Sequence, residues 1–301
     1  MQMIDNKTKS YLEKQHYKVI GSHSAVKLCT WTKKSLRGED VCYKEKFYGI
    51  KSHRCCQMSP CLACTNQCVF CWRELSTPTA LEWGWDIDEP EQIIKGCIEK
   101  QRKLLEGYKG YPRVNMKRFE EAQNPNQFAI SLSGEPTMYS KLKELILELN
   151  KKGSTFLVTN GMFPDKLKGL SPTQLYVSVD APNKKIYSKI DRPGFKDAWE
   201  RLNKTLEVVS DMSCRRVLRL TLVKGLNMVD EEGYANLIKK AKPDFVEAKA
   251  YMWVGSSRQR LTIENMPRHH EIKEFAEKIA KTANLKILDE KEESRVVLLG
   301  K

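Results

Sequence analysis

The sequence predicts an α/β protein built as a partial barrel of six β/α units behind an N-terminal extension. From Phe47 onward, short apolar runs alternate with amphipathic helical stretches, which is typical of parallel strands joined by right-handed crossovers. Six units are too few to close an eight-stranded barrel, so we expect an open one. We therefore divide the chain into an extension at 1–46, a core at 47–284 and a terminal tail at 285–301.

Each element is predicted from its residue pattern. The expected strands are short and mostly apolar: 47–54, 128–132, 155–158, 175–179, 216–223 and 244–250. The expected core helices repeat apolar residues at helical spacing: 90–105, 139–149, 198–209, 231–240 and 269–280. We also expect a first helix over 7–20, an irregular segment over 21–46, and one or two strands without catalytic residues in the tail.

Two of the predicted strands have one polar face. In 216–223, Arg219 and Thr221 alternate with leucines, and in 244–250, Glu247 and Lys249 alternate with apolar residues. A strand covered by helices on both faces would be apolar throughout. The polar face is therefore expected to line a lumen that holds a ligand, and an edge strand facing solvent is the alternative.

Composition and charge narrow the class of protein. The 301 residues are 41% hydrophobic, and no run of about 18 apolar residues that would span a membrane is present. The first nine residues are polar and unlike a secretory signal, so we expect a cytoplasmic protein. A net charge of +14, spread in short basic patches, favours a shaped polyanion such as tRNA as the partner. The alternative is a solvated lysine-rich surface.

Cysteine spacing is the most informative local pattern. Cys64, Cys68 and Cys71 follow the spacing C-x3-C-x2-C, and three thiolates on one short loop can hold three irons of a four-iron cluster. The fourth iron is then free to bind the amino and carboxylate groups of a methionine-like ligand. The alternative is a zinc site that also uses Cys61, but only three residues separate the two C-x2-C pairs, so the tetrahedron would be strained.

This loop, with Phe70 before its last cysteine, resembles the motif of the radical S-adenosylmethionine superfamily. The resemblance implies a partial barrel of the radical SAM type with this loop after the first strand. Ser133-Gly134-Glu135-Pro136 resembles the family's glycine-rich element, although Ser133 stands where the family usually has a glycine. Turn residues also follow the next two strands. The resemblance implies contacts with S-adenosylmethionine at Ser133, Gly134, Glu135, Thr159, Asn160, Ser178, Asp180 and Arg219.

A second set of cysteines precedes the loop. Cys29, Cys42 and Cys55 are spaced by thirteen and thirteen residues, which suggests a second cluster with one open iron. Cys56 competes with Cys55 as the third ligand. In a strand the two side chains would point to opposite faces.

These three cysteines, Met58-Ser59-Pro60 and Phe70-Cys71-Trp72-Arg73 resemble the archaeal tRNA 4-demethylwyosine synthases, from about Lys27 to about Tyr251. The resemblance implies two [4Fe-4S] clusters, S-adenosylmethionine as cosubstrate, and tRNA-Phe carrying N1-methylguanosine beside the anticodon. Two carbons of pyruvate would complete the tricyclic base 4-demethylwyosine. No segment resembles the flavodoxin-like part of eukaryotic relatives, so we expect an external electron donor, and we expect a monomer.

The same resemblance assigns a catalytic role to Lys44. A lysine at this place is proposed in the family to form a Schiff base with pyruvate, which requires a nucleophilic amine. Two alternatives stay open: the open iron of the second cluster binds pyruvate directly, or Lys44 is an ordinary solvated lysine like its neighbour Lys46.

Two rival functions complete the analysis. A radical SAM enzyme with an auxiliary cluster that acts on a peptide would usually carry its extra cysteines after the core, whereas here they precede it. A non-catalytic RNA-binding protein stabilised by zinc or by a cluster would also explain the basic charge.

Overall fold

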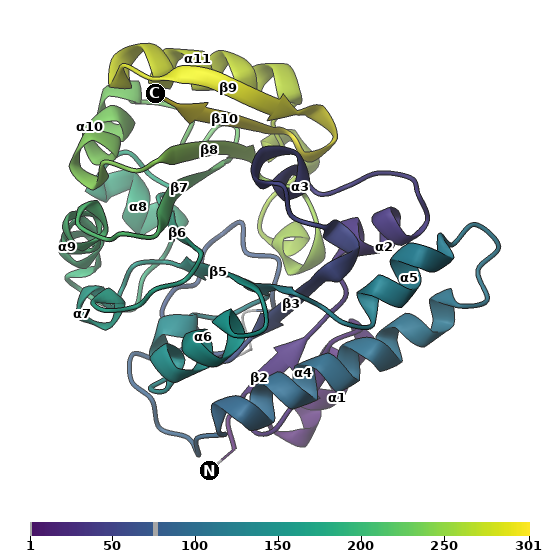
Figure 1. Cartoon of the computed structure of the whole chain (residues 1–301). Helices are drawn as coiled ribbons and strands as arrows, with labels where there is room; N and C mark the ends of the chain where they lie inside the picture. The colour runs from purple at the N-terminus through teal and green to yellow at the C-terminus, as the bar shows by residue number, and fades with distance from the viewer. Residues whose placement is uncertain (1, 75–77) are drawn as a thin grey trace. The chain divides into compact units, whose positions relative to one another are not determined.

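The computed structural model describes residues 2–74 and 78–301 and divides into two compact units (Figure 1). The first unit comprises residues 1–64, 82–158 and 170–173, and the second comprises 65–81, 159–169 and 174–301. No helix within the described ranges has the length and apolarity needed to cross a membrane.

The first unit contains five strands in sequential order. They are β1 (Lys18–Ile20), β2 (Ser24–Val26), β3 (Cys55–Ser59), β4 (Gln127–Ile130) and β5 (Ser154–Thr159), whose last residue falls in the second unit. Strands β1, β2 and β3 pair antiparallel, while β3, β4 and β5 pair parallel. Strand β4 is buried along its whole length, as a strand covered on both faces should be.

Six helices and three 3-10 turns of the first unit lie within its described residues. They are α1 (Asn6–Lys14), α2 (Thr30–Leu36), α3 (Tyr43–Tyr48), α4 (Pro90–Leu105), α5 (Met116–Ala122) and α6 (Leu142–Asn150), with 3-10 turns η1 (Ser52–Arg54), η2 (Glu106–Tyr108) and η3 (Pro136–Met138). Helix α4 starts with proline at its first turn, where no amide hydrogen is needed. It buries Ile93, Ile94 and Cys97 on one face and packs against α6.

The second unit contains the other five strands. They are β6 (Gln174–Ser178), β7 (Arg215–Leu222), β8 (Phe245–Ala250), β9 (Lys286–Lys291) and β10 (Val296–Gly300), in the order β6-β7-β8-β10-β9. Strands β6, β7 and β8 are parallel, whereas β10 is antiparallel to both β8 and β9. The prediction of terminal strands in 285–299 is confirmed.

Helices of the second unit connect and cover these strands. They are α7 (Pro164–Leu167), α8 (Lys184–Ile190), α9 (Ala198–Ser210), α10 (Glu231–Ala241) and α11 (His269–Ala283), with 3-10 turns η4 (Gly255–Gln259), η5 (Ile263–Asn265) and η6 (Glu292–Ser294). Helix α10 packs between α9 and α11, and α11 also contacts β8, β9 and β10 (Figure 1).

The polar faces of β7 and β8 are real, and they are interior to the sheet. Strand β7 pairs with β6 and β8, and β8 pairs with β7 and β10, so neither strand is an edge. Glu247 is fully buried although it is charged, and its partner is Arg219 on β7. The edge-strand alternative is therefore wrong.

The α/β class is confirmed, with six parallel strands of which three begin in each unit. The N-terminal third differs from the prediction. The first helix ends at Lys14 rather than Ile20, since His16 adopts a left-handed conformation before β1 begins. The segment 21–46 is not irregular, because it holds β2, α2 and the start of α3.

The predicted strand 47–54 is wrong. Helix α3 continues to Tyr48 and stops at Gly49, whose φ of 71° ends the helix in a left-handed cap. The turn η1 follows, and the first parallel strand is β3, at Cys55–Ser59.

Candidate active site

The C-x3-C-x2-C loop begins at the end of the first unit and continues into the second. Cys64 is the last residue of the first unit's opening segment, and Cys68 and Cys71 follow in the second. All three thiols are partly exposed.

Within the first unit, the approach to Cys64 is packed against the predicted glycine-rich element. Ser59 Oγ donates to Ser133 O at 2.5 Å, and Glu135 N donates to Ala63 O at 2.7 Å. Gly134 has a φ of 75°, and a Cβ there would lie 2.1 Å from Cys61 O. Only glycine fits this place, because it must both adopt the left-handed region and let two backbones touch.

Glu135 itself is committed to local structure. Its carboxylate is buried and accepts hydrogen bonds from Thr137 N at 3.0 Å and Thr137 Oγ1 at 2.5 Å, which caps η3. The chemistry that this element offers to a ligand is therefore carried by its backbone rather than by this carboxylate.

Within the second unit, the segment 190–194 runs beside the cysteine loop. Val69 N donates to Ile190 O at 2.8 Å, Gln67 N donates to Arg192 O at 3.1 Å, and Gly194 N donates to Thr65 O at 2.9 Å. Asn160, one of the predicted site residues, donates from Nδ2 to Thr65 Oγ1 at 2.8 Å. This hydrogen bond links the residue that follows β5 to the cysteine loop.

A buried carboxyl group lies beside Cys68. Asp191 Oδ1 is 3.5 Å from Cys68 Sγ, and Asp191 is 3% exposed. Burial, with the nearby charge of Asp180, raises the pKa of Asp191 well above its ordinary value. No local pattern in the sequence predicts this neighbour, because 123 residues separate the two.

The other predicted residues of the second unit lie at the ends of β5, β6 and along β7. Thr159 Oγ1 accepts from Gly161 N at 3.1 Å, and Ser178 ends β6. Asp180 Oδ1 accepts from Thr221 N at 2.7 Å, and burial raises the pKa of Asp180 to about 6.

Arg219 is held by two partners on neighbouring strands. Its guanidinium lies 3.1 Å from Glu247 Oε2 and 4.3 Å from the ring centroid of Tyr176. Glu247 contacts one edge of the planar guanidinium and Tyr176 lies against its face, and the side chain stays partly exposed. The guanidinium is thereby fixed in direction, which suits the recognition of a ligand oxygen.

The second set of cysteines comes together in the first unit. Cys29 and Cys42 are the N-cap residues of α2 and α3, and neither sulfur caps its helix. Burial raises the pKa of the Cys55 thiol well above its ordinary value, the neighbouring thiols of Cys29, Cys42 and Cys56 raise it further, and the charge of Lys44 opposes them. Cys29, Cys42 and Lys44 therefore lie near Cys55, although they are distant from it in the sequence.

Cys56 faces the other side of β3. It is fully buried, and burial raises the pKa of its thiol well above the ordinary value, with a further contribution from the Cys97 thiol of α4. The geometry therefore favours Cys55 over Cys56 as the partner of Cys29 and Cys42.

A hydrogen-bond network fixes the backbone around this second site. Ser52 Oγ accepts from Cys42 N at 2.9 Å and donates to Glu45 Oε2 at 2.6 Å. Thr32 Oγ1 donates to Ser52 O at 3.0 Å, and Gln101 Nε2 donates to Cys55 O at 3.2 Å. None of these four polar residues was predicted, because ordinary Ser, Thr, Glu and Gln carry no pattern of their own.

Lys44 projects from α3 into this site. It is 8% exposed, and its Nζ lies 5.3 Å from the ring centroid of Phe156 on β5. A lysine this deeply buried is rare unless it is paired or functional. The reading of Lys44 as a solvated lysine is therefore disfavoured.

Both predicted sets of three cysteines offer only sulfur donors. Among residues 2–74 and 78–301, no group of three His, Cys, Asp or Glu side chains is arranged to hold one metal ion. In a cubane, each thiolate binds a different iron, so convergence on one point is unnecessary. Two sets of three thiols, each with only sulfur donors, match that chemistry.

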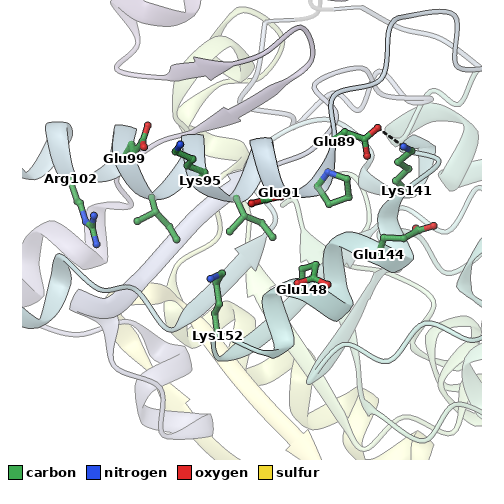
Figure 2. Close-up of a pocket in the computed structure, with 12 residues that line it drawn as sticks. Glu89, Glu91, Lys95, Glu99, Arg102, Lys141, Glu144, Glu148 and Lys152 are labelled. Atoms are coloured by element: carbon green, nitrogen blue, oxygen red, sulfur yellow. Dashed lines mark hydrogen bonds and ion pairs between the residues drawn. The ribbon is translucent and has the colours of Figure 1, made fainter.

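A separate groove of about 970 Å³ lies between α4 and α6 (Figure 2). Its charged lining mixes carboxylates with cations: Glu89, Glu91, Lys95, Glu99, Arg102, Lys141, Glu144, Glu148 and Lys152. Lys141 Nζ pairs with Glu89 at 2.5 Å. None of the predicted site residues lines the groove, so we do not assign the chemistry to it.

Known proteins match this chain over most of its length. Residues 58–238 match the Radical SAM superfamily, and residues 240–301 match the family described as Wyosine base formation. The S-adenosyl-L-methionine-dependent tRNA 4-demethylwyosine synthase of Pyrococcus abyssi is 53% identical over 294 residues, which cover 95% of this chain and 86% of that protein.

Two solved structures share the fold over almost the whole chain. The structure of TYW1 with a lysine–pyruvate adduct bound is 38% identical with a TM-score of 0.90, and covers 99% of this chain and 97% of its own. The crystal structure of archaeal TYW1 is 35% identical with a TM-score of 0.82, and covers 99% and 96%. The chain therefore belongs to the radical SAM superfamily and, within it, to the tRNA 4-demethylwyosine synthase family.

Proposed function

We propose that this enzyme converts N1-methylguanosine in tRNA-Phe, beside the anticodon, into 4-demethylwyosine with two carbons of pyruvate. The observation that carries the proposal is the grouping of Cys29, Cys42, Cys55 and Lys44 in a chain that also has the radical SAM loop. A radical SAM enzyme needs only the loop for its basic chemistry. The second site would hold the second substrate, pyruvate.

Two [4Fe-4S] clusters would be held by these residues. Cys64, Cys68 and Cys71 would hold the first, and Cys29, Cys42 and Cys55 the second. With S-adenosylmethionine, the first supplies a carbon radical able to remove a hydrogen atom from a methyl group. The backbone at Ser133, Gly134 and Glu135, and the side chains of Thr159, Asn160, Ser178, Asp180 and Arg219, would bind and orient S-adenosylmethionine.

Lys44 would hold pyruvate. Its amine attacks the ketone carbon, water leaves, and a carbon–nitrogen double bond forms, so atoms balance without an oxidant. The burial of Lys44 and its place over Phe156 support this role, because a site shielded from water protects the product from hydrolysis. The lysine–pyruvate adduct named for the solved TYW1 is a precedent.

The remaining assignments follow from the sequence. We propose a monomeric cytoplasmic enzyme that takes electrons from a separate donor and binds tRNA through its basic surface. The division into an extension at 1–46, a core at 47–284 and a tail at 285–301 is part of the same proposal.

The test is direct. The protein is loaded with iron and sulfide without oxygen, then incubated with methylated tRNA-Phe, uniformly ¹³C-labelled pyruvate, S-adenosylmethionine and dithionite. Mass spectrometry of the digested tRNA should find a nucleoside that has gained two labelled carbons. About eight irons per chain should be bound, falling to about four when Cys29, Cys42 and Cys55 are replaced by alanine.

Cys56→Ala is the matched control, since Cys56 faces away from the site. If the labelled carbons stay absent while S-adenosylmethionine is cleaved, the substrate assignment is wrong. If zinc and no iron is bound, the enzyme assignment itself is wrong.

A further inference from the structure

The cysteine loop accepts two hydrogen bonds from one arginine in the C-terminal part of the chain. Arg260 Nε donates to Val69 O at 3.1 Å, and Arg260 Nη2 donates to Cys71 O. These two carbonyls flank the last turn of the C-x3-C-x2-C loop. One planar guanidinium therefore fixes the direction of the main chain on both sides of Phe70.

The turn η4 brings Arg260 to this place. Ser256 N donates to Trp72 O at 3.0 Å, and Ser256 Oγ donates to Glu74 Oε2 at 3.1 Å. Gly255 has a φ of 58°, and a Cβ there would lie 2.3 Å from Trp72 O. The backbones of η4 and of the loop are thus in direct contact, so Arg260 starts from a fixed base.

Further hydrogen bonds tie η4 to the residue that follows β8. Tyr251, which follows β8 directly, is buried and donates from its hydroxyl to Ser257 Oγ at 2.8 Å. Ser257 Oγ in turn donates to Val254 O at 2.6 Å, and Arg260 N donates to Ser257 O at 3.0 Å. The turn that carries Arg260 is therefore anchored to the end of strand β8.

Both bonds of Arg260 to the loop end on neutral main-chain carbonyls. An arginine that served only surface electrostatics would pair with carboxylates and stay mobile. Main-chain carbonyls in a loop need partners, and a fork that satisfies two of them rigidifies the loop.

We propose that Arg260 is a positioning residue, which fixes the main chain from Val69 to Cys71 so that the Cys68 and Cys71 sulfurs keep the spacing a cluster needs. The inference rests on the proposed cluster at this loop. It also assigns a task to the segment 240–301, which matches the Wyosine base formation family, because this segment shapes a loop that lies in the radical SAM match.

The experiment compares Arg260→Met and Arg260→Lys with Arg258→Met. Arg258 is the matched control because it lies in the same turn, but it donates to Trp253 O at 3.1 Å and stacks on the Trp253 ring instead of contacting the loop. All variants also carry Cys29→Ala, Cys42→Ala and Cys55→Ala, so that only the cluster at the loop is observed.

The main readout is the rate at which a ferrous chelator removes iron after anaerobic loading. Arg260→Met should lose iron about ten-fold faster than Arg258→Met, since residues that orient metal ligands affect affinity by about 10–100-fold. Arg260→Lys should lie between them, because it restores one of the two bonds. The second readout is hydrogen exchange of the 65–73 amides before loading, which should be faster in Arg260→Met alone.

Rates within two-fold of Arg258→Met for both Arg260 variants would overturn the positioning role. Should Arg260→Met fail to fold, Arg260→Lys carries the comparison. If the protein with all its cysteines holds iron but leaves tRNA unmodified, the proposed reaction is wrong and this inference still stands. The two failures are therefore distinguishable.

Discussion

Lys44 differs from the other lysine of its helix by burial. Lys44 is 8% exposed, whereas Lys46, two residues further along α3, is exposed. We expect borohydride to trap a pyruvate adduct on Lys44 in the loaded enzyme, and we expect Lys44→Ala to lose that adduct and nearly all product. Peptide mass spectrometry measures the adduct directly.

Lys46→Ala provides the comparison. It removes one positive charge from the same helix but keeps the buried amine of Lys44. Its adduct and product should match the parent within about two-fold. An adduct that persists in Lys44→Ala at the parent level would assign pyruvate to another group.

Asp180 makes stability depend on pH in the acid range. Burial raises its pKa to about 6 in the folded chain, from about 3.9 when unfolded. Folding therefore binds a proton at this carboxyl, and its contribution is fully present below pH 4 and lost as pH rises through 6. The free energy lost is about 2–3 kcal/mol.

Asp180→Asn removes this titration while an amide oxygen can still accept from Thr221 N. Relative to the parent, the variant should gain stability as pH rises from 4.5 to 7, measured as urea midpoints at three pH values. The exposed residue Asp211, replaced by asparagine, should show no such trend. A flat difference between Asp180→Asn and the parent would mean that Asp180 is charged in the folded chain throughout.

At the scale of elements, the glycine-rich turn lies in direct backbone contact with the residues that lead into the cysteine loop. A Cβ at Gly134 would lie 2.1 Å from Cys61 O and 2.7 Å from Ala63 O. Gly134→Ala should therefore lower the unfolding free energy by about 3 kcal/mol or more, because backbone must move and φ is positive. Thermal unfolding measures this loss.

Gly110→Ala is the matched change, since no atom lies within 4 Å of its Cβ position. It should shift the midpoint by little, within about 0.5 kcal/mol. Equal stability of the two variants would show that the turn yields easily, and the packing argument would fail.

The long helices and the apolar strands β4 to β8 were predictable from the sequence to within a few residues, whereas the short elements of the N-terminal third were not. Helix α4 begins and ends as predicted, and α9, α10 and α11 differ by at most three residues, because their apolar faces repeat over several turns. Strand β3 has the sequence Cys-Cys-Gln-Met-Ser, which offers little β propensity, so its position is decided by its pairing with β2 and β4.

The candidate site divides in the same way. Cysteine spacing is written in the sequence, so both sets of thiols could be named from it. Asp191 and Arg260 approach the loop from 123 and 189 residues away, and only the folded chain brings them there. Such partners leave no local pattern.

Over the whole molecule, the net charge of +14 supports the proposed binding of tRNA. Neutralising several phosphates releases counterions, so tRNA affinity should fall steeply with salt, by about ten-fold or more between 50 and 200 mM. Filter binding with methylated tRNA-Phe measures the slope. An affinity that ignores salt would show that the basic residues face away from the RNA.

Cys29 and Cys42 each stand at the start of a very short helix, seven residues in α2 and six in α3. Helices of this length do not persist alone in water, so a metal group that ties their first turns to β3 doubles as a staple for the N-terminal region. Oxygen that strips this group would then expose cleavable chain between the two helices. A molecule damaged in this way would be open to proteolysis, so the proposed second cluster would also report whether the enzyme is intact.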